Sequence, residues 1–216
     1  MHVLDPRNRV METFEVLAGE YARLRRSLFP EVERLVLRGR FSSMCDAGSG
    51  PGAYLGLFAS RSSAMVLLDL SKRMIDAAWD KALKEGMGWR VHCLVCDVTH
   101  LPLRGELFDL TTSIAVVHHL PKDLSHLAVR EIVRVTSKGG NALLSVWSPE
   151  AMDKVEGKAA SGDMSLIWWR TPQGFMARDY WRWKPREFGD LFKLCDIPYF
   201  DVFASGGNIF AFVLKI

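Results

Sequence analysis

Three acidic residues stand where strands of a predicted parallel sheet end. Asp46, Asp69 and Asp97 each follow a largely apolar stretch. The first is followed by glycines on alternate positions: Gly48, Gly50 and Gly52. Glycine lets a backbone turn sharply and lie against a ligand because it has no Cβ. Open α/β sheets bind ligands at the carboxyl ends of their strands, so the sequence predicts a site made of this glycine loop and the three carboxylates.

The charge of Asp46 indicates which ligand the loop can face. The spacing Gly48-x-Gly50-x-x-Ala53 also fits a dinucleotide-binding loop, so the glycines alone leave the question open. A carboxylate repels a pyrophosphate and attracts an ammonium or a sulfonium group. S-adenosylmethionine carries both cations and no phosphate. Asp69 suits the ribose hydroxyls of either ligand, and Asp97 can accept from the exocyclic amine of an adenine.

Elements that could position these acids follow from the apolar pattern, which predicts an α/β chain. Strands are expected at about 41–47, 64–69, 90–96, 110–117 and 141–147, with a closing hairpin at about 199–203 and 209–215. Helical segments are expected between Val10 and Leu37, with a new helix starting at Pro30, and near 53–59. Ser71 is expected to cap another helix. A further helix, near 123–135, is expected to end at Lys138-Gly139-Gly140.

One domain, residues 1–216, is expected, with an N-terminal helical segment of about 1–40 and an insertion at about 148–196 that breaks the βα alternation. The net charge of +3 permits a nucleic-acid partner without implying one, and no apolar run is long enough to span a membrane. The start of the chain, residues 1–9, is polar, and the scattered cysteines fit a reducing cytoplasm.

Cys93-x-x-Cys96 lies in a predicted strand, so its cysteines are interpreted as core residues on opposite faces, and no metal site is expected.

Within the insertion, residues 168–186 mix aromatic and basic side chains. The aromatic residues are Trp168, Trp169, Phe175, Tyr180, Trp181 and Trp183, and the bases are Arg170, Arg178, Arg182, Lys184 and Arg186, against one acid, Asp179. Aromatic faces stack on unpaired bases and cations hold phosphates, so this mixture suits single-stranded RNA. A lid anchored in the core by its aromatic residues fits the composition equally well.

The loop from Asp46 to Gly52 resembles the Asp-x-Gly-x-Gly-x-Gly motif of class I methyltransferases. Within that class, the run 113–120 (SIAVVHHL) resembles the tRNA wobble-uridine carboxymethyl methyltransferases, as do 96–103 (CDVTHLPL), 143–147 (LLSVW) and Gly207-Asn208-Ile209. Arg25…Phe29-Pro30 and Arg178-Asp179-Tyr180-Trp181 resemble two more elements of that family. The resemblance departs from its pattern in the substrate region, at Asp179, Trp181 and Ile209.

This resemblance implies a seven-stranded, Rossmann-like, mostly parallel sheet with an antiparallel C-terminal hairpin. It implies S-adenosylmethionine as cofactor, contacted by Asp46, Gly48, Gly50, Gly52, Asp69, Leu70, Asp97, Val98 and Ala115. On the acceptor side it implies Arg25, Arg178 and Tyr180, with His118 or His119 near the methyl group. The implied reaction esterifies the carboxylate of 5-carboxymethyluridine in a tRNA anticodon loop. The implied partner is a small zinc-binding activator protein that forms a heterodimer through the edge at residues 90–96 and nearby apolar residues such as Met65.

Three other readings stay open at this stage. A small-molecule methyltransferase, similar to quinone-biosynthesis enzymes, also carries His-His-Leu at this strand end, and it would not need the basic aromatic segment. A dinucleotide-dependent oxidoreductase is opposed by Asp46 and by the closing hairpin. A non-catalytic RNA-binding protein is opposed by the intact series of acids.

Overall fold

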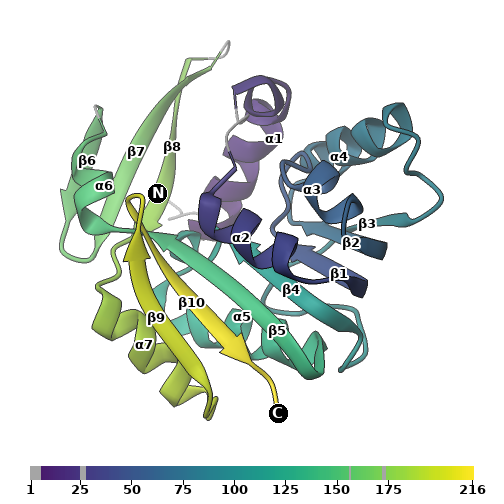
Figure 1. Cartoon of the computed structure of the whole chain (residues 1–216). Helices are drawn as coiled ribbons and strands as arrows, with labels where there is room; N and C mark the ends of the chain where they lie inside the picture. The colour runs from purple at the N-terminus through teal and green to yellow at the C-terminus, as the bar shows by residue number, and fades with distance from the viewer. Residues whose placement is uncertain (1–5, 25–27, 156, 172–173) are drawn as a thin grey trace.

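A seven-stranded sheet, here called sheet A, forms the centre of the molecule (Figure 1), in the order β3-β2-β1-β4-β5-β10-β9. The computed structural model describes residues 6–24, 28–155, 157–171 and 174–216. The strands of sheet A are β1 (Phe41–Ala47), β2 (Ser62–Asp69), β3 (Val91–Val95), β4 (Phe108–Ile114), β5 (Thr136–Trp147), β9 (Phe200–Ser205) and β10 (Asn208–Leu214). The first five are parallel, and β10 pairs antiparallel with β5 and β9. The expected fold class is therefore confirmed.

Helices cover both faces of sheet A because the parallel strands are apolar on both sides. On one face α2 (Pro30–Arg38), α3 (Leu55–Ala59) and α4 (Lys72–Lys84) build one buried cluster. On the other, α5 (Lys122–Val135) and α7 (Pro185–Leu194) build a second. Pro30 begins α2 and Ser71 caps α4 through the N–H of Met74, as expected. In the part of the chain that the structure describes, no helix is both long and apolar enough to cross a membrane.

Strand order reverses between β1 and β4, and this switch point places a ligand crevice above their carboxyl ends. The helix α1 (Pro6–Leu24) lies over this end of the sheet (Figure 1). It reaches α4 through an ion pair between Glu15 and Arg73, 3.8 Å apart, and it packs along β8 as well.

The insertion contains a second, three-stranded antiparallel sheet, here called sheet B, that the sequence pattern did not reveal. Its strands are β6 (Lys158–Ser161), β7 (Met164–Thr171) and β8 (Gly174–Trp181), and α6 (Pro149–Asp153) precedes it. The free edge of β8 docks on the rest of the molecule through side chains. The carbonyl of Ala177 accepts from Thr13 Oγ1 at 3.1 Å, and that of Asp179 lies 2.9 Å from His119 Nδ1.

Two expected boundaries are wrong. The fourth strand ends at Ile114, and residues Val117–His119 form a 3-10 turn, so both histidines lie beyond the strand. The glycines at 139–140 do not terminate a helix: α5 ends at Val135 and the chain passes directly into β5. Gly140 lies in β5 opposite a register shift in β4, where an added Cβ would come within 2.9 Å of the Asp109 carbonyl oxygen.

We expect Gly140→Ala to lower the free energy of unfolding by about 1–3 kcal/mol, because its methyl group meets backbone atoms that cannot move aside. Gly19→Ala, in α1 with open space around it, is the matched control and should stabilise by up to about 1 kcal/mol. Urea denaturation of both variants measures the difference. Equal stability of the two proteins would contradict the packing described for the start of β5.

Candidate functional site

A pocket opens at the switch point between β1 and β4, under α1. Among the residues that line it are seven of the predicted cofactor residues: Gly48, Gly50, Asp69, Leu70, Asp97, Val98 and Ala115. Apolar side chains from four elements enclose it, among them Met74, Leu101, Ile114 and Leu120. His119 lies on the same wall. The carboxyl ends of β1, β2, β3 and β4 therefore converge on one site, as the acid series predicts.

The glycine loop has a backbone that side chains would not allow. Gly48 and Gly50 have φ angles of 84° and 54°, in the left-handed region. A Cβ on Gly48 would fall 2.2 Å from Val116 Cγ2. Gly52 packs against Ala78 of α4 and is not among the residues lining the pocket; its role is to bring the loop close to that helix.

Asp69 ties the end of β2 to the glycine loop. One carboxylate oxygen accepts from the N–H of Gly50 at 2.8 Å, and the other accepts from the N–H of Ser71 at 2.9 Å. Burial raises the pKa of Asp69 to about 6, because the loss of solvation outweighs these hydrogen bonds to the charged form. The Asp69 carboxylate thus faces the pocket from the end of β2 as a hydrogen-bond acceptor that loses its charge when the pH falls below about 6.

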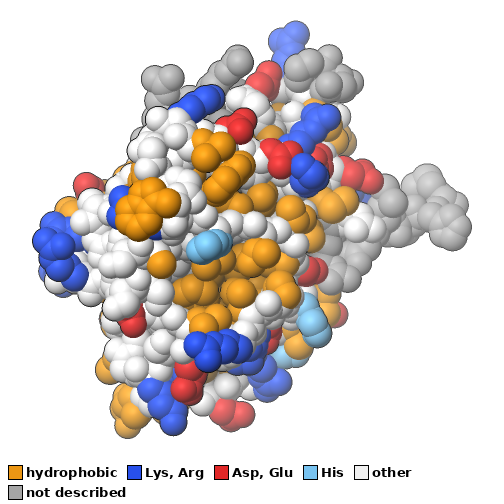
Figure 2. All heavy atoms as spheres, turned by 90° about the vertical axis from the view of Figure 1, so that its right-hand side faces the viewer, with side chains coloured by type: hydrophobic (Ala, Val, Ile, Leu, Met, Phe, Trp, Pro, Cys, Tyr) orange, Lys and Arg blue, Asp and Glu red, His pale blue; other side chains and the backbone are white. Residues whose placement is uncertain are grey.

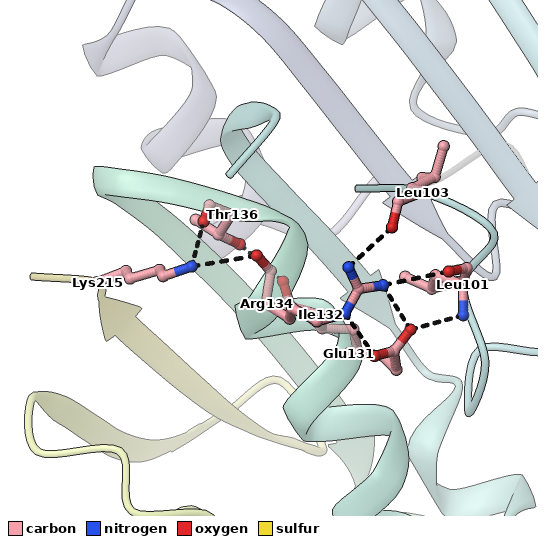
Figure 3. Close-up of polar contacts among 7 residues, drawn as sticks. All are labelled: Leu101, Leu103, Glu131, Ile132, Arg134, Thr136 and Lys215. Carbon is pink, nitrogen blue, oxygen red and sulfur yellow. Dashed lines mark hydrogen bonds and ion pairs between the residues drawn. The ribbon is translucent and has the colours of Figure 1, made fainter. Parts of the chain in front are cut away.

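Asp97 begins a loop that an ion pair of α5 holds in place. Its Oδ1 accepts from the N–H and the hydroxyl of Thr99, both at 2.8 Å. Further along the loop, Glu131 accepts from the N–H of Leu101 and Arg134 donates to the carbonyls of Leu101 and Leu103 (Figure 3). The hydrogen bonds from Arg134 are also the main reason that the pKa of Glu131 is lowered. This clamp fixes the segment that carries Asp97 and Val98.

Asp46 takes a different position from the other two acids. It is buried, and its Oδ1 accepts from the hydroxyl of Thr112 on the neighbouring strand β4 at 2.7 Å. It lies behind the glycine loop and is not among the residues lining the pocket. The structure therefore places the Asp46 carboxylate against Thr112 of β4 and not in the pocket wall where the sequence predicts it.

The structure separates the two histidines. The N–H of Trp147 donates to His118 Nδ1 at 2.9 Å, so this nitrogen carries no proton, and the ring is buried away from the pocket. His119 Nδ1 lies 2.9 Å from the Asp179 carbonyl, which can only accept, so this nitrogen carries a proton. His118 is held by the backbone, and His119 is the one that lines the pocket.

Arg178 and Tyr180 lie next to this histidine pair and are almost fully buried. The Arg178 guanidinium carbon sits 4.5 Å from the ring centre of Trp169, 5.0 Å from that of Phe14 and 5.2 Å from that of Tyr180. Among the described residues it has no carboxylate partner, and its buried Nε has no hydrogen-bond partner. Arg25, the other predicted acceptor residue, lies outside the described residues.

The sequence analysis did not identify some of the residues that form the pocket and its surroundings. Phe14 and Tyr21 of α1 line the pocket, and Asp179, which the sequence marks only as a departure from a motif, pairs with Arg9 of the same helix at 3.2 Å. Burial raises the pKa of Asp179, whereas Arg9 lowers it by a smaller amount. A helix far from the glycine loop in sequence offers no local signal that it will cover the pocket.

Comparison with known proteins assigns the family. Residues 45–144 match the model of a family described as "Methyltransferase domain". The chain belongs to the class I methyltransferases. It is 34% identical over 146 residues, 67% of its length, to a tRNA (carboxymethyluridine(34)-5-O)-methyltransferase of Arabidopsis thaliana, and 30% identical over the same share to that of Xenopus tropicalis. A relative of that name from Schizosaccharomyces pombe is 28% identical over 74% of this methyltransferase.

Coverage of these relatives differs. The chain spans 34% of the Arabidopsis protein, 22% of the Xenopus protein and 67% of the fission yeast protein. Among solved structures, a methyltransferase from Clostridium acetobutylicum superposes with a TM-score of 0.72 at 14% identity, over 94% of this chain and 99% of the other. A protein from Pyrococcus horikoshii superposes with a TM-score of 0.71 at 16% identity, over 87% and 88%. These likenesses confirm the fold.

Class I methyltransferases use S-adenosylmethionine, and the pocket of this methyltransferase fits that cofactor. Gly48 and Gly50 present bare backbone to the pocket, and Asp69 offers a carboxylate at the end of β2. The dinucleotide-dependent oxidoreductase considered from the glycine spacing is thereby set aside.

We expect the affinity for S-adenosylmethionine to fall as the pH drops below about 6. The sequence predicts that the ribose hydroxyls of the ligand donate to the charged form of Asp69, and such a contact would lower the pKa of Asp69 from about 6 and release a proton on binding. Calorimetry in buffers of different ionisation enthalpy measures that proton. Asp69→Asn should bind more weakly and lose the pH dependence; an unchanged profile in this variant would assign the titration to another group.

Proposed function

We propose that this methyltransferase esterifies the carboxylate of 5-carboxymethyluridine at the wobble position of tRNA. The observation that carries the proposal is the buried guanidinium of Arg178 without a carboxylate partner among the described residues. The names of the relatives from Arabidopsis, Xenopus and fission yeast point to the same acceptor. A substrate carboxylate is the natural partner of such a cation, because a guanidinium binds carboxylates bidentately.

The free-energy cost of burying the Arg178 charge supports a role for this side chain in binding an anionic ligand. Taking a charge out of water costs several kcal/mol, and each desolvated cation–π contact returns about 2 kcal/mol or more, but an aromatic ring has no net charge and supplies no counter-ion. The three rings of Phe14, Trp169 and Tyr180 therefore hold the side chain in place without neutralising it. Phe14 also lines the cofactor pocket, so the cation and the cofactor site share a wall.

For this reaction the protein has to position the two reactants, and proton transfer is less important. S-adenosylmethionine supplies a methyl group on a positively charged sulfur. The acceptor carboxylate is already ionised near neutral pH, so no general base is required. We assign Arg178 to orienting that carboxylate, with Tyr180 packed beside it and His119 forming the wall toward the cofactor. Holding two reactants in line in this way is a large source of rate acceleration.

On the cofactor side, we assign Asp69 to the ribose hydroxyls and Asp97 to the adenine amine. Leu70, Val98 and Ala115 form the apolar walls beside them. Asp46 acts through the glycine loop and Thr112 on the amino-acid end. His118 serves as a buried support for His119, since its Nδ1 is engaged by the backbone of Trp147.

A second candidate is methyl transfer to a small carboxylic acid. It is favoured by the burial of Arg178 under α1, which a small molecule meets more easily than an RNA loop does. Transfer of labelled methyl groups to tRNA containing carboxymethyluridine, to the unmodified tRNA and to free 5-carboxymethyluridine separates the two candidates. The tRNA proposal requires transfer to the modified tRNA only, and transfer to the free nucleoside at an equal rate would favour the second candidate.

We expect Arg178→Met to reduce methyl transfer about a hundredfold or more while leaving the affinity for S-adenosylmethionine unchanged, since the lost partner is on the acceptor side. The free energy of unfolding should stay equal or rise, because a buried charge that meets no carboxylate among the described residues is replaced by an apolar chain. Arg186→Met, at an exposed position of α7, is the matched control. Weakened cofactor binding or a clear loss of stability in Arg178→Met would make this arginine structural.

We further propose that a small zinc-binding activator protein binds the β3 edge of sheet A. The face that carries α4 and β3 gathers apolar side chains (Figure 2), and Trp79, Leu83, Leu94 and Val95 are each more than a third exposed. An open strand edge beside an apolar surface suits a partner that adds a strand. Met65, which the sequence analysis placed on this surface, is buried and cannot contribute. Cys93 and Cys96 pack on opposite faces of the sheet, as expected for a strand.

We expect Val95→Glu to abolish copurification with a co-expressed activator, because a carboxylate would be buried at the interface. Leu194→Glu, at an exposed position on α7, is the matched control and should copurify normally. Retention of the partner by Val95→Glu, or its loss with Leu194→Glu, would contradict the placement at β3.

A further inference from the structure

One face of the β7–β8 hairpin leaves aromatic side chains in solvent. Trp168 is 46% exposed and Phe175 is 71% exposed, and Arg170 between them is exposed as well. The strand register places Arg170 directly opposite Phe175, and Trp168 lies two residues from Arg170 along β7. The three side chains therefore share one face of sheet B. Trp169 and Arg178, one residue out of phase, share the opposite face.

This face, made of Trp168, Arg170 and Phe175, is here called the hairpin platform. Two large rings left in water are unfavourable to a protein that could bury them, so they are better explained by a partner than by the core. The sequence between Asp163 and Asp179 holds two arginines and no acidic residue. Arg178 is buried on the opposite face, so Arg170 is the cation that the platform presents beside its rings, and this combination complements a polyanion that carries exposed aromatic groups.

Unpaired RNA bases are the groups that match this chemistry. Every base has a π-face that can stack on an aromatic side chain, and a guanidinium can bind a phosphate or stack in its turn. A duplex would hide the base faces, so the platform selects a loop or an unpaired end. Phe175 lies three residues from Arg178 along β8, about 10 Å by the rise of a strand. The two side chains point to opposite faces of sheet B, so the single-stranded segment that joins them has to pass around the hairpin.

We propose that the hairpin platform stacks unpaired bases of the substrate RNA loop while a neighbouring nucleotide reaches the acceptor side at Arg178. The proposal rests on the proposed function, since it takes an RNA loop as the acceptor. The proposal assigns the surface of this methyltransferase that binds the loop: Trp168 and Phe175 stack on bases, and Arg170 binds the adjoining phosphate.

The test uses the full chain and a synthetic RNA stem-loop of anticodon-arm size that carries 2-aminopurine in its loop, a base whose fluorescence is quenched by stacking. We expect Trp168→Leu and Phe175→Leu each to weaken binding about tenfold and to reduce the quenching, and the double variant to lose about a hundredfold. Phe175→Tyr keeps a ring and should bind as the parent does. Tyr199→Leu, another exposed aromatic position, is the matched control.

The outcomes separate this proposal from the proposed function. Unchanged affinity and quenching in the double variant overturn the platform, and methyl transfer to modified tRNA by the same variant leaves the function standing. Equal losses of affinity for a duplex without a loop also overturn it, since a duplex offers no free base face. If stacking on the loop is lost in the variants but the parent methylates no tRNA, the platform stands and the carboxymethyluridine proposal falls.

Discussion

Sheets A and B contact each other through a buried cluster of aromatic rings, and the position of Arg178 depends on this cluster. Tyr180 of sheet B lies 4.9 Å from His118, 4.5 Å from His119 and 5.2 Å from Trp147, between ring centres. Aromatic pairs of this kind contribute about 0.5–1.5 kcal/mol each beyond the area they bury. Arg178 lies two residues before Tyr180 on the same face of β8, so the cluster that holds the tyrosine also sets the position of the guanidinium.

The cofactor half of the site could be predicted from the sequence because its signals are local. An apolar run, an acid and a glycine loop follow one another within a few residues, and β1, β2 and β3 end within one residue of their expected positions, whereas β4 ends three residues early. What the sequence does not contain is the direction of each carboxylate. Asp46 turns toward Thr112 of β4 because the two strands are neighbours in the sheet, and that pairing joins residues 66 positions apart.

The acceptor half depends on contacts between distant segments, which local patterns do not encode. The basic aromatic segment was visible, but the RNA and lid interpretations each describe one face of it: Tyr180 is buried, whereas Trp168 is exposed. The roles of His118 and His119 are separated by two distant backbone groups: the N–H of Trp147, 29 residues from His118, and the carbonyl of Asp179, 60 residues from His119. Sheet B was not predicted because β7 and β8 carry large side chains on both faces and β6 is only four residues long, so none of the three shows the apolar-polar alternation that marks a half-buried strand.

Helix α1 touches both halves of the site, and this has a kinetic consequence. Its Phe14 side chain lies against the cofactor pocket and against Arg178, while Glu15 reaches α4 and Arg9 reaches β8. The pair between Glu15 and Arg73 is largely exposed and worth at most about 1 kcal/mol, so it opposes a swing of the helix only weakly. Because one element covers both compartments, a displacement of α1 would open them together and would couple the exchange of spent cofactor to the departure of the methylated product.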